Sequence, residues 1–271
     1  MGSVNYKPCS ASCKLIHNNS INSEIFRLDF NWQSAQAGVK LMAPKAGQFF
    51  MIKPQRSAVF LGRPISVANW NPVTVTFLIA RRGQGTLELA AMRNGEEAEL
   101  TGPLGNAWMD FLPDVQKNGK PVALVGGGIG LAPLNALLCE SPGLSFDLYA
   151  GFRKGLNTGE KTALLGAAYL EADKVIIASE NGKDEHKGLI PDFLEPENYA
   201  AVCACGPEPM LKAVAAKCAA SGVPCFISLE RRMACGVGAC LGCTVKTVNG
   251  NRRCCADGPV FKAEEVFFNE K

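Results

Sequence analysis

Five cysteines near the carboxyl end constrain this chain more than any other feature. Cys235, Cys240 and Cys243 have the spacing C-x4-C-x2-C, and the doublet Cys254-Cys255 follows them. Three thiolates in this spacing, with a fourth from a later segment, are typical of a plant-type [2Fe–2S] cluster. Glycines between the cysteines allow positive φ and bring backbone amides close to such a centre. The pattern therefore predicts a cluster held by the three spaced cysteines and one member of the doublet.

A structural zinc ion is the alternative that these cysteines leave open, because four thiolates also satisfy tetrahedral zinc. Zinc sites usually combine two short C-x2-4-C pairs. Here one loop holds three cysteines and a later segment supplies the fourth, which favours the cluster. Further cysteines lie in apolar segments and are expected to be small buried hydrophobes: Cys139, Cys203, Cys205, Cys218 and Cys225.

The composition is that of an ordinary globular protein. Of 271 residues, 47% are hydrophobic and 20% are charged, which provides for a sizeable core. The net charge of +3 is too small to predict nucleic-acid binding. The 12 cysteines lack the dense pattern of a small secreted scaffold, and residues 1–22 lack the apolar core of a signal peptide, so a cytoplasmic setting is expected. The uncharged run 122–139 is interrupted by glycines and Pro133, so no membrane span is expected.

Residues 1–116 contain short segments of β-branched and aromatic residues separated by turn residues. We expect strands at 23–30, 47–53, 64–69 and 73–81, and a short helix at 87–92. Several strands at such short spacing predict an antiparallel β-barrel.

Strands and helices alternate over residues 117–229, which predicts a parallel α/β sheet with right-handed crossovers. The expected strands are 121–125, 145–151, 174–179, 200–205 and 224–229, and the expected helices are 131–139, 160–169 and 207–221. A polar stretch at 113–120 marks the boundary with the barrel, and a small domain at 230–271 carries the cysteine loop. The predicted fold is multidomain, β followed by α/β.

Two loops in the α/β part favour dinucleotide binding. The run from Gly126 to Gly130 follows a strand and opens a helix, where backbone amides can hold a pyrophosphate. Its G-x-G-x-x-G fingerprint is incomplete, because Pro133 stands in place of the third glycine. A second loop again lies between a strand and a helix. The candidate residues of the two loops are Gly127, Gly128, Gly130, Cys205, Gly206 and Pro207.

Two stretches of the barrel could hold a flavin. Arg63-Pro64-Ile65-Ser66 offers a guanidinium for phosphate, a rigid turn and a hydroxyl able to reach the edge of a flavin ring. Taken alone, this stretch also fits an ordinary strand start. Gly85-Thr86 at a helix start could hold phosphate or only cap the helix.

The order of these motifs along the chain is similar to that of a known family. RPIS, GQGT, GPLGN, GGGIGLAPL, CGPEPML and SLERRMACGVGACLGC with a closing CADGPVF resemble the electron-transfer subunits of NAD-dependent dihydroorotate dehydrogenases, in the ferredoxin-reductase superfamily. The resemblance covers nearly the whole chain. It implies that the barrel binds FAD, the α/β domain binds NAD(H) and the last segment binds a [2Fe–2S] cluster.

The resemblance also assigns site residues. The implied flavin contacts are Arg63, Pro64, Ile65, Ser66, Leu78, Ile79, Ala80, Gly85 and Thr86, and the implied cluster ligands are Cys235, Cys240, Cys243 and Cys255. Cys255 is preferred because the family's last cysteine stands just ahead of an acidic-Gly-Pro-Val-Phe ending, which this chain has from Asp257 to Phe261. The choice stays open at this point, because Cys254 and Cys255 would point to opposite sides of an extended strand.

The activity implied by the resemblance is an electron relay in pyrimidine biosynthesis. A catalytic partner containing FMN oxidises dihydroorotate to orotate, and electrons pass through the cluster to FAD and then to NAD+. The implied complex holds two copies of each chain. Alternatives are a related subunit of a hydrogenase or of an NADH-dependent ferredoxin:NADP oxidoreductase. The latter oxidoreductases have aspartate at the first cluster position, where this chain has Cys235. A zinc-stabilised nucleotide-binding or assembly module is the alternative of another class.

Overall fold

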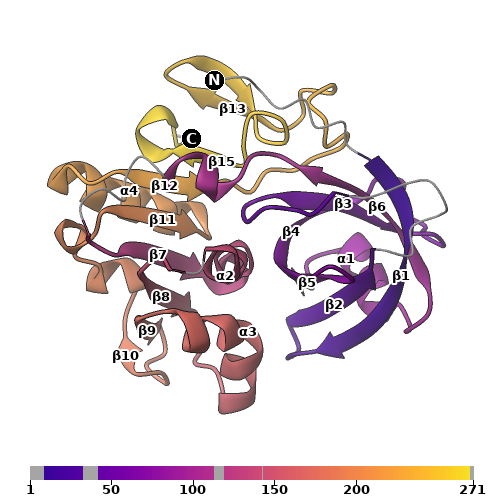
Figure 1. Ribbon diagram of the computed structural model, residues 1–271, viewed down its shortest axis with the longest axis horizontal. Helices are drawn as coiled ribbons and strands as arrows, with labels where there is room; N and C mark the ends of the chain where they lie inside the picture. Colours follow the sequence, from indigo (N-terminus) through magenta and orange to yellow (C-terminus); the bar gives the residue numbers. More distant parts are fainter. Residues whose placement is uncertain (1–8, 33–41, 113–118, 142, 269–271) are drawn as a thin grey trace.

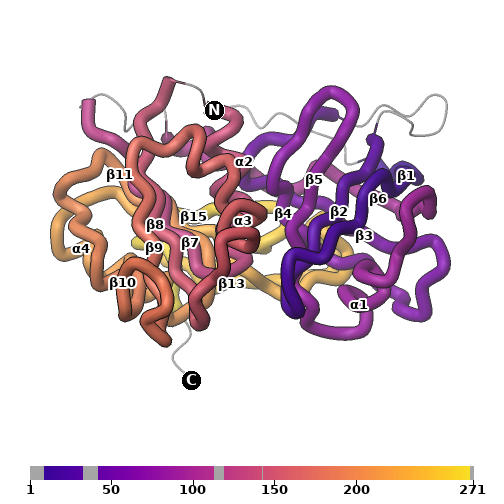
Figure 2. The backbone as a smooth tube through the Cα atoms, turned by 90° about the horizontal axis from the view of Figure 1, so that it is seen from below, coloured from indigo at the N-terminus to yellow at the C-terminus, as the bar shows by residue number. Residues whose placement is uncertain are grey.

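The computed structural model describes residues 9–32, 42–112, 119–141 and 143–268. A barrel and an α/β sheet lie side by side, and the carboxyl-terminal segment runs across both (Figure 1). The same segment lies behind both parts when the molecule is seen from below (Figure 2). Within the described residues, no helix is both long and apolar enough to cross a membrane.

The predicted antiparallel barrel is confirmed. Its strands close in the order β1-β2-β5-β4-β3-β6. They are β1 (Cys9–Ser20), β2 (Ile25–Asn31), β3 (Phe49–Pro54), β4 (Arg63–Trp70), β5 (Thr74–Ala80) and β6 (Glu97–Leu104), with helix α1 (Gln84–Ala91) between β5 and β6. Inward-facing aromatic residues fill the interior, where the Phe50 and Phe77 rings meet edge to face with centroids 5.8 Å apart.

The α/β part contains a seven-stranded sheet in the order β10-β9-β8-β7-β11-β12-β15. Its elements are β7 (Val122–Gly127), α2 (Leu131–Glu140), β8 (Phe146–Phe152), α3 (Thr158–Glu171), β9 (Lys174–Ser179), β10 (His186–Lys187), β11 (Ala201–Cys205), α4 (Glu208–Ser221) and β12 (Cys225–Ser228). Short 3-10 helices are η1 (Trp108–Asp110), η4 (Gly128–Gly130), η5 (Ile190–Phe193), η6 (Pro196–Asn198) and η7 (Ala263–Glu265). Strands β7 to β12 are parallel, as the sequence predicts. The chain starts at β7 and moves outward to β10, then returns to the other side of β7, so the strand order reverses between β7 and β11.

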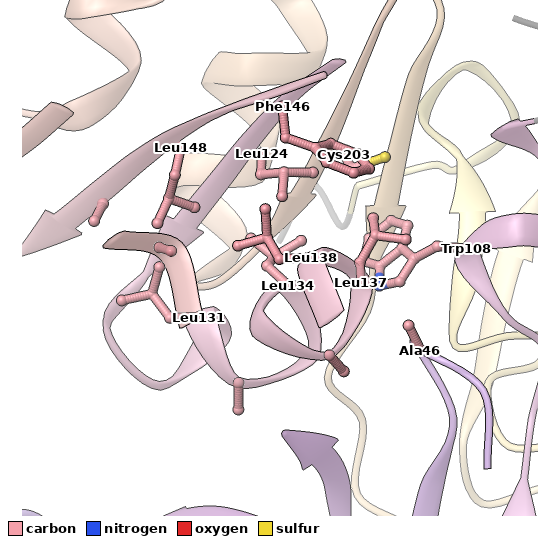
Figure 3. Close-up of a cluster of buried hydrophobic side chains, with 14 of the residues drawn as sticks. Ala46, Trp108, Leu124, Leu131, Leu134, Leu137, Leu138, Phe146, Leu148 and Cys203 are labelled. Atoms are coloured by element: carbon pink, nitrogen blue, oxygen red, sulfur yellow. The ribbon is translucent and has the colours of Figure 1, made fainter. Parts of the chain in front are cut away.

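Alternate residues of the central strands supply two cores. Leu124 faces α2 and α3 on the side toward the barrel, whereas Val125 faces α4 on the other side. Figure 3 shows the first core, in which the leucines of α2 meet the strand residues Leu124, Phe146 and Leu148. Trp108, which follows the last barrel strand, is fully buried in the same core. The barrel and the sheet therefore share one hydrophobic interface.

The cysteine-bearing segment belongs to neither part alone. It forms a hairpin of β13 (Thr244–Thr247) and β14 (Gly250–Arg253), and then β15 (Val260–Lys262). β15 pairs antiparallel with β12 and so becomes the edge strand of the α/β sheet, with Ile227 opposite Phe261. The boundary predicted at 116/117 lies outside the described residues.

One prediction about the remaining cysteines is wrong. Cys203 and Cys218 are buried, and Cys205 and Cys225 are partly buried, but Cys139 is exposed. It lies in the last turn of α2, beyond the leucines that face the core. An apolar neighbourhood in the sequence therefore did not determine which face of the helix this residue occupies.

Candidate functional site

In the loop from Cys235 to Cys243, backbone N–H groups donate hydrogen bonds to the cysteine sulfurs of the same loop. The N–H groups of Cys240 and Gly242 donate to the sulfurs of Cys235 and Cys240, at 3.4 Å and 3.5 Å. Gly236 and Gly238 take φ values of +71° and +80°, which residues with a side chain rarely adopt. N–H groups directed at sulfur are what an iron–sulfur centre uses to tune its thiolate ligands.

The four candidate thiols lie as two pairs. Cys235 is hydrogen-bonded to Cys240, and Cys243 is hydrogen-bonded to Cys255. No three His, Cys, Asp or Glu side chains in the described part of the chain are grouped closely enough to hold one metal ion. A [2Fe–2S] centre takes its four protein ligands two to each iron, so the paired arrangement fits that group.

The structure separates the two cysteines of the doublet. The Cys255 sulfur accepts a hydrogen bond from the Gly238 N–H at 3.1 Å and so lies inside the loop. The Cys254 sulfur points the other way, is fully buried, and donates to the Leu229 carbonyl at 3.2 Å. Burial raises the pKa of both thiols to about 12, so the direction of the two sulfurs, and not their pKa, separates them. Cys255 is therefore the better candidate for the fourth ligand.

The pKa of the Cys235 thiol, in contrast, is lowered. Burial raises the pKa of its thiol, but the N–H groups of Cys240, Val237 and Ala239 outweigh that cost and lower the pKa to about 6. A thiolate is the form that binds iron, so this cysteine is prepared to act as a ligand.

The cysteine loop rests on the barrel next to the flavin motif. A Cβ atom placed on Gly236 would lie 2.8 Å from Met51 Cγ and 3.0 Å from Leu104 Cδ1. Met51 of β3 stands opposite Pro64 of β4 in the barrel. Neighbouring strands are about 4.8 Å apart. The loop and the RPIS stretch are therefore separated by little more than one strand.

Arg63 lies across the start of helix α1. A Cβ atom on Gly85 would lie 2.0 Å from Arg63 Nε, so only glycine leaves room for this guanidinium. Among the described residues, no hydrogen-bonding or ion-pair partner of Arg63 is found. A free guanidinium beside a helix amino terminus is suited to a phosphate. Thr86, in contrast, caps the helix, because its hydroxyl accepts from the Gly83 N–H at 3.1 Å and donates to the Gly83 carbonyl at 2.9 Å.

The other flavin candidates do not all face one place. Ile65 is partly buried against the barrel interior, whereas Ile79 is buried within it, so Ile79 can approach a flavin only through its backbone. Leu78 points out of the barrel into the interface with α2. Pro64, Ser66 and Ala80 are only partly buried. The predicted set therefore divides into residues that could offer side chains and residues that could offer backbone atoms.

The two predicted nucleotide loops meet at the carboxyl ends of adjacent strands. Gly126 at the end of β7 stands opposite Cys205 at the end of β11. A Cβ atom on Gly130 would lie 2.1 Å from the Cys205 carbonyl oxygen, and one on Gly127 would lie 2.7 Å from Pro207 Cδ. The strand order reverses here, and open α/β sheets bind ligands at such a reversal. Burial raises the pKa of the Cys205 thiol to about 12, so it stays uncharged beside the loops.

Sequence reasoning gave no role to Asn106, although it belongs to the GPLGN stretch. Its side chain donates to the Val260 carbonyl at 2.8 Å and accepts from the Val260 N–H at 3.0 Å. Its own N–H donates to the Gly258 carbonyl at 2.7 Å. Asn106 therefore fastens the barrel to the chain that follows the cysteine doublet. An asparagine in a glycine-rich turn was the available signal, but it did not indicate the partner.

Comparison with known proteins finds relatives that cover up to 94% of this chain. The family model "iron-sulfur cluster binding domain of dihydroorotate dehydrogenase B" matches residues 230–267. The dihydroorotate dehydrogenase B (NAD(+)) electron transfer subunit of Clostridium perfringens is 44% identical over 227 residues, which are 82% of this chain and 87% of that one. The subunit of the same name from Caldanaerobacter subterraneus subsp. tengcongensis is 38% identical over 261 residues, 94% of this chain and 97% of that one.

A solved structure supports the same fold. A structure of NADH-dependent reduced ferredoxin-NADP oxidoreductase aligns with a TM-score of 0.75 over 94% of this chain and 90% of that chain. The two sequences are 24% identical. The similarity extends over the barrel, the α/β sheet and the cysteine segment together.

Proposed function

The chain belongs to the family of electron transfer subunits of dihydroorotate dehydrogenase B (NAD(+)), and on this premise we propose that it carries electrons from a dihydroorotate-oxidising partner to NAD+. When bound, a [2Fe–2S] cluster supplies one-electron transfer and FAD joins it to the two-electron chemistry of nicotinamide. The cluster would be held by Cys235, Cys240, Cys243 and Cys255. This chain would not oxidise dihydroorotate itself.

The observation that carries the proposal is the contact between the cysteine loop and the barrel. Gly236 packs on Met51, and Met51 stands opposite Pro64 of the flavin motif. The loop that carries three candidate cluster ligands is thereby held against β3, and the candidate flavin contacts Arg63 to Ser66 lie on the neighbouring strand β4. Such fixed proximity is what a protein contributes to electron transfer, because the redox chemistry belongs to the cofactors.

Other residues of this chain would bind FAD and NAD(H) and hold the two binding sites together. Arg63, at the start of α1, would bind the phosphates of FAD, since it has a charge and no partner among the described residues. The contacting loops at Gly130 and Cys205 would place NAD(H) at the edge of the sheet. The shared hydrophobic interface around Trp108 keeps the two sites from separating.

The cysteine loop would also face the partner subunit. Val237 and Leu241, which alternate with the candidate ligands, are 48% and 62% exposed. Exposed apolar side chains around a redox centre favour docking of another protein. That the partner contains FMN, that the complex holds two copies of each chain, and that it is cytoplasmic stay predictions.

Co-expression with a dihydroorotate dehydrogenase catalytic subunit tests the proposal. We expect a yellow-brown complex with flavin and iron–sulfur absorption that reduces NAD+ when dihydroorotate is added. Cys240→Ser should abolish NAD+ reduction while dihydroorotate oxidation with an artificial dye persists. Cys139→Ser, which changes an exposed cysteine outside the loop, should leave both rates unchanged.

Two results would contradict the proposal. Orotate formation by the purified single chain would contradict the division of work between the subunits. A colourless, folded protein with stoichiometric zinc would instead support the zinc-stabilised module.

A further inference from the structure

Arg253 lies against the cysteine loop from the outside. Arg253 is the last residue of β14 and immediately precedes the cysteine doublet. A Cβ atom on Gly238 would lie 3.4 Å from both Cδ and Nη1 of Arg253. The Gly238 N–H is the group that donates to the Cys255 sulfur at 3.1 Å. The guanidinium therefore packs on the residue that contacts a candidate cluster ligand.

Asp257 holds this guanidinium in place. Its carboxylate accepts from Arg253 Nε at 2.9 Å and from Nη2 at 3.0 Å, which is a bidentate pair. The same carboxylate accepts from the Arg253 backbone N–H at 2.7 Å and so closes the turn that contains the doublet. One turn thus carries a positive charge, a negative charge and a candidate ligand in fixed positions.

From this geometry we propose that the Arg253–Asp257 pair sets the reduction potential of the cluster, Arg253 raising it and Asp257 lowering it. The inference rests on the proposed function, since it requires a cluster in the loop. Reduction adds one negative charge to the centre. A nearby cation favours the reduced form and a nearby anion disfavours it. Both residues therefore act on the cluster through charge, without acting as ligands.

Solvent weakens the influence of these two charges on the reduction potential without cancelling it. The Arg253 side chain is 42% exposed and that of Asp257 is 20% exposed. Screening is incomplete at such sites, because the protein side of the pair replaces part of the water. Asp257 offsets much of the electrostatic field of Arg253. Replacing either residue alone should therefore shift the reduction potential more than replacing both.

The test uses the full chain with its cluster and FAD, and measures the midpoint potential of the cluster by spectroscopic redox titration. Arg253→Gln should lower the potential and Asp257→Asn should raise it, each by at least a threefold change in the reduction equilibrium. A threefold change is about 28 mV, since a tenfold change in a one-electron equilibrium is 59 mV. Arg253→Lys, which keeps the charge, should move the potential less than Arg253→Gln.

Arg252→Gln is the matched control. Arg252 carries the same charge one residue earlier, but it is exposed and its side chain points to the other face of β14. Its loss should shift the potential less than the loss of Arg253. The double variant Arg253→Gln/Asp257→Asn should fall between the two single variants.

Opposite shifts for Arg253→Gln and Asp257→Asn support the inference. Shifts in the same direction, or no threefold change in either variant, overturn it. Where Arg253→Gln fails to hold a cluster, Asp257→Asn decides alone, because a raised potential supports the inference and an unchanged one refutes it. Wild-type protein without iron and sulfide would refute the proposed function, whereas an intact cluster insensitive to both charges refutes this inference only.

Discussion

Replacing Gly85 by alanine should remove most of the flavin affinity without weakening the fold. The added methyl group would lie 2.0 Å from Arg63 Nε, so the guanidinium must leave the start of α1. A hydrogen bond to a charged group contributes about 1.5–3 kcal/mol. Since 1.4 kcal/mol is a factor of ten, FAD should bind about 10- to 100-fold more weakly. Alanine in place of glycine in a helix also stabilises it by about 0.5–1 kcal/mol, so the flavin-free protein should be at least as stable.

Titration of FAD into flavin-free protein, followed by flavin fluorescence, measures the affinity, and thermal unfolding measures the stability. Gly166→Ala is the control, because Gly166 lies within helix α3 of the α/β part and an added Cβ would have nothing within 4 Å. It should stabilise the fold and leave FAD affinity unchanged. Adding Gly85→Ala to Arg63→Gln should cost little more than Arg63→Gln alone. A Gly85→Ala protein that binds FAD as tightly as the wild type would refute the placement of phosphate at Arg63.

Three other changes test separate parts of the structure. Cys255→Ser should abolish the iron–sulfur absorption, whereas Cys254→Ser should retain it and lose about 1 kcal/mol of stability at most; the reverse result would reassign the fourth ligand. Asn106→Ala should lower the free energy of unfolding by about 1–3 kcal/mol in urea titrations, because it leaves the buried Val260 N–H without its acceptor. Burial raises the pKa of Glu140, which therefore contributes stability when protonated, below its ordinary pKa of 4.5, and loses it as pH rises. Glu140→Gln should thus be at least as stable as wild type at pH 7, with the gap closing toward pH 4; a wild-type advantage that grows with pH would contradict this.

The sequence predicts the α/β sheet closely because its parallel strands are buried on both faces. Runs such as 121–125 and 175–178 are continuously apolar and are bounded by glycine or polar residues. The structure has β7 at Val122–Gly127 and β9 at Lys174–Ser179. Local composition was sufficient here, because no distant partner was needed to decide the conformation.

Strands β1, β6 and β15 are among those that escaped sequence reasoning, because their pairing is not local. β1 contains few β-branched residues, and it is a strand because it pairs with β2 and with the distant β6. β6 carries alternating charged and apolar residues with a glycine and a proline near its end. β15 has three residues and depends on β12. Propensity alone gives weak signals for such elements.

Some features of the candidate site are local sequence patterns, and others depend on contacts between distant segments. The spacing of Cys235, Cys240 and Cys243 is a local pattern and identified the loop directly. The choice between Cys254 and Cys255 depends on a turn and on the Leu229 carbonyl, neither of which the sequence displays. Arg63 lies against Gly85 because β4 and α1 meet in the folded barrel, so the steric reason for this glycine was invisible until the two elements were placed together.

The position of β15 limits how this chain can be recombined with its relatives. The sequence predicts a domain boundary at residue 230, yet a cut there would remove the edge strand β15 from the sheet along with the cysteine loop. A segment transplanted from a relative would have to pair in register with Phe226 to Ser228 of β12 in the host. It would also have to form the hydrogen bond to Asn106 of the host barrel. Exchange of this segment alone would therefore require matched changes in both the sheet and the barrel.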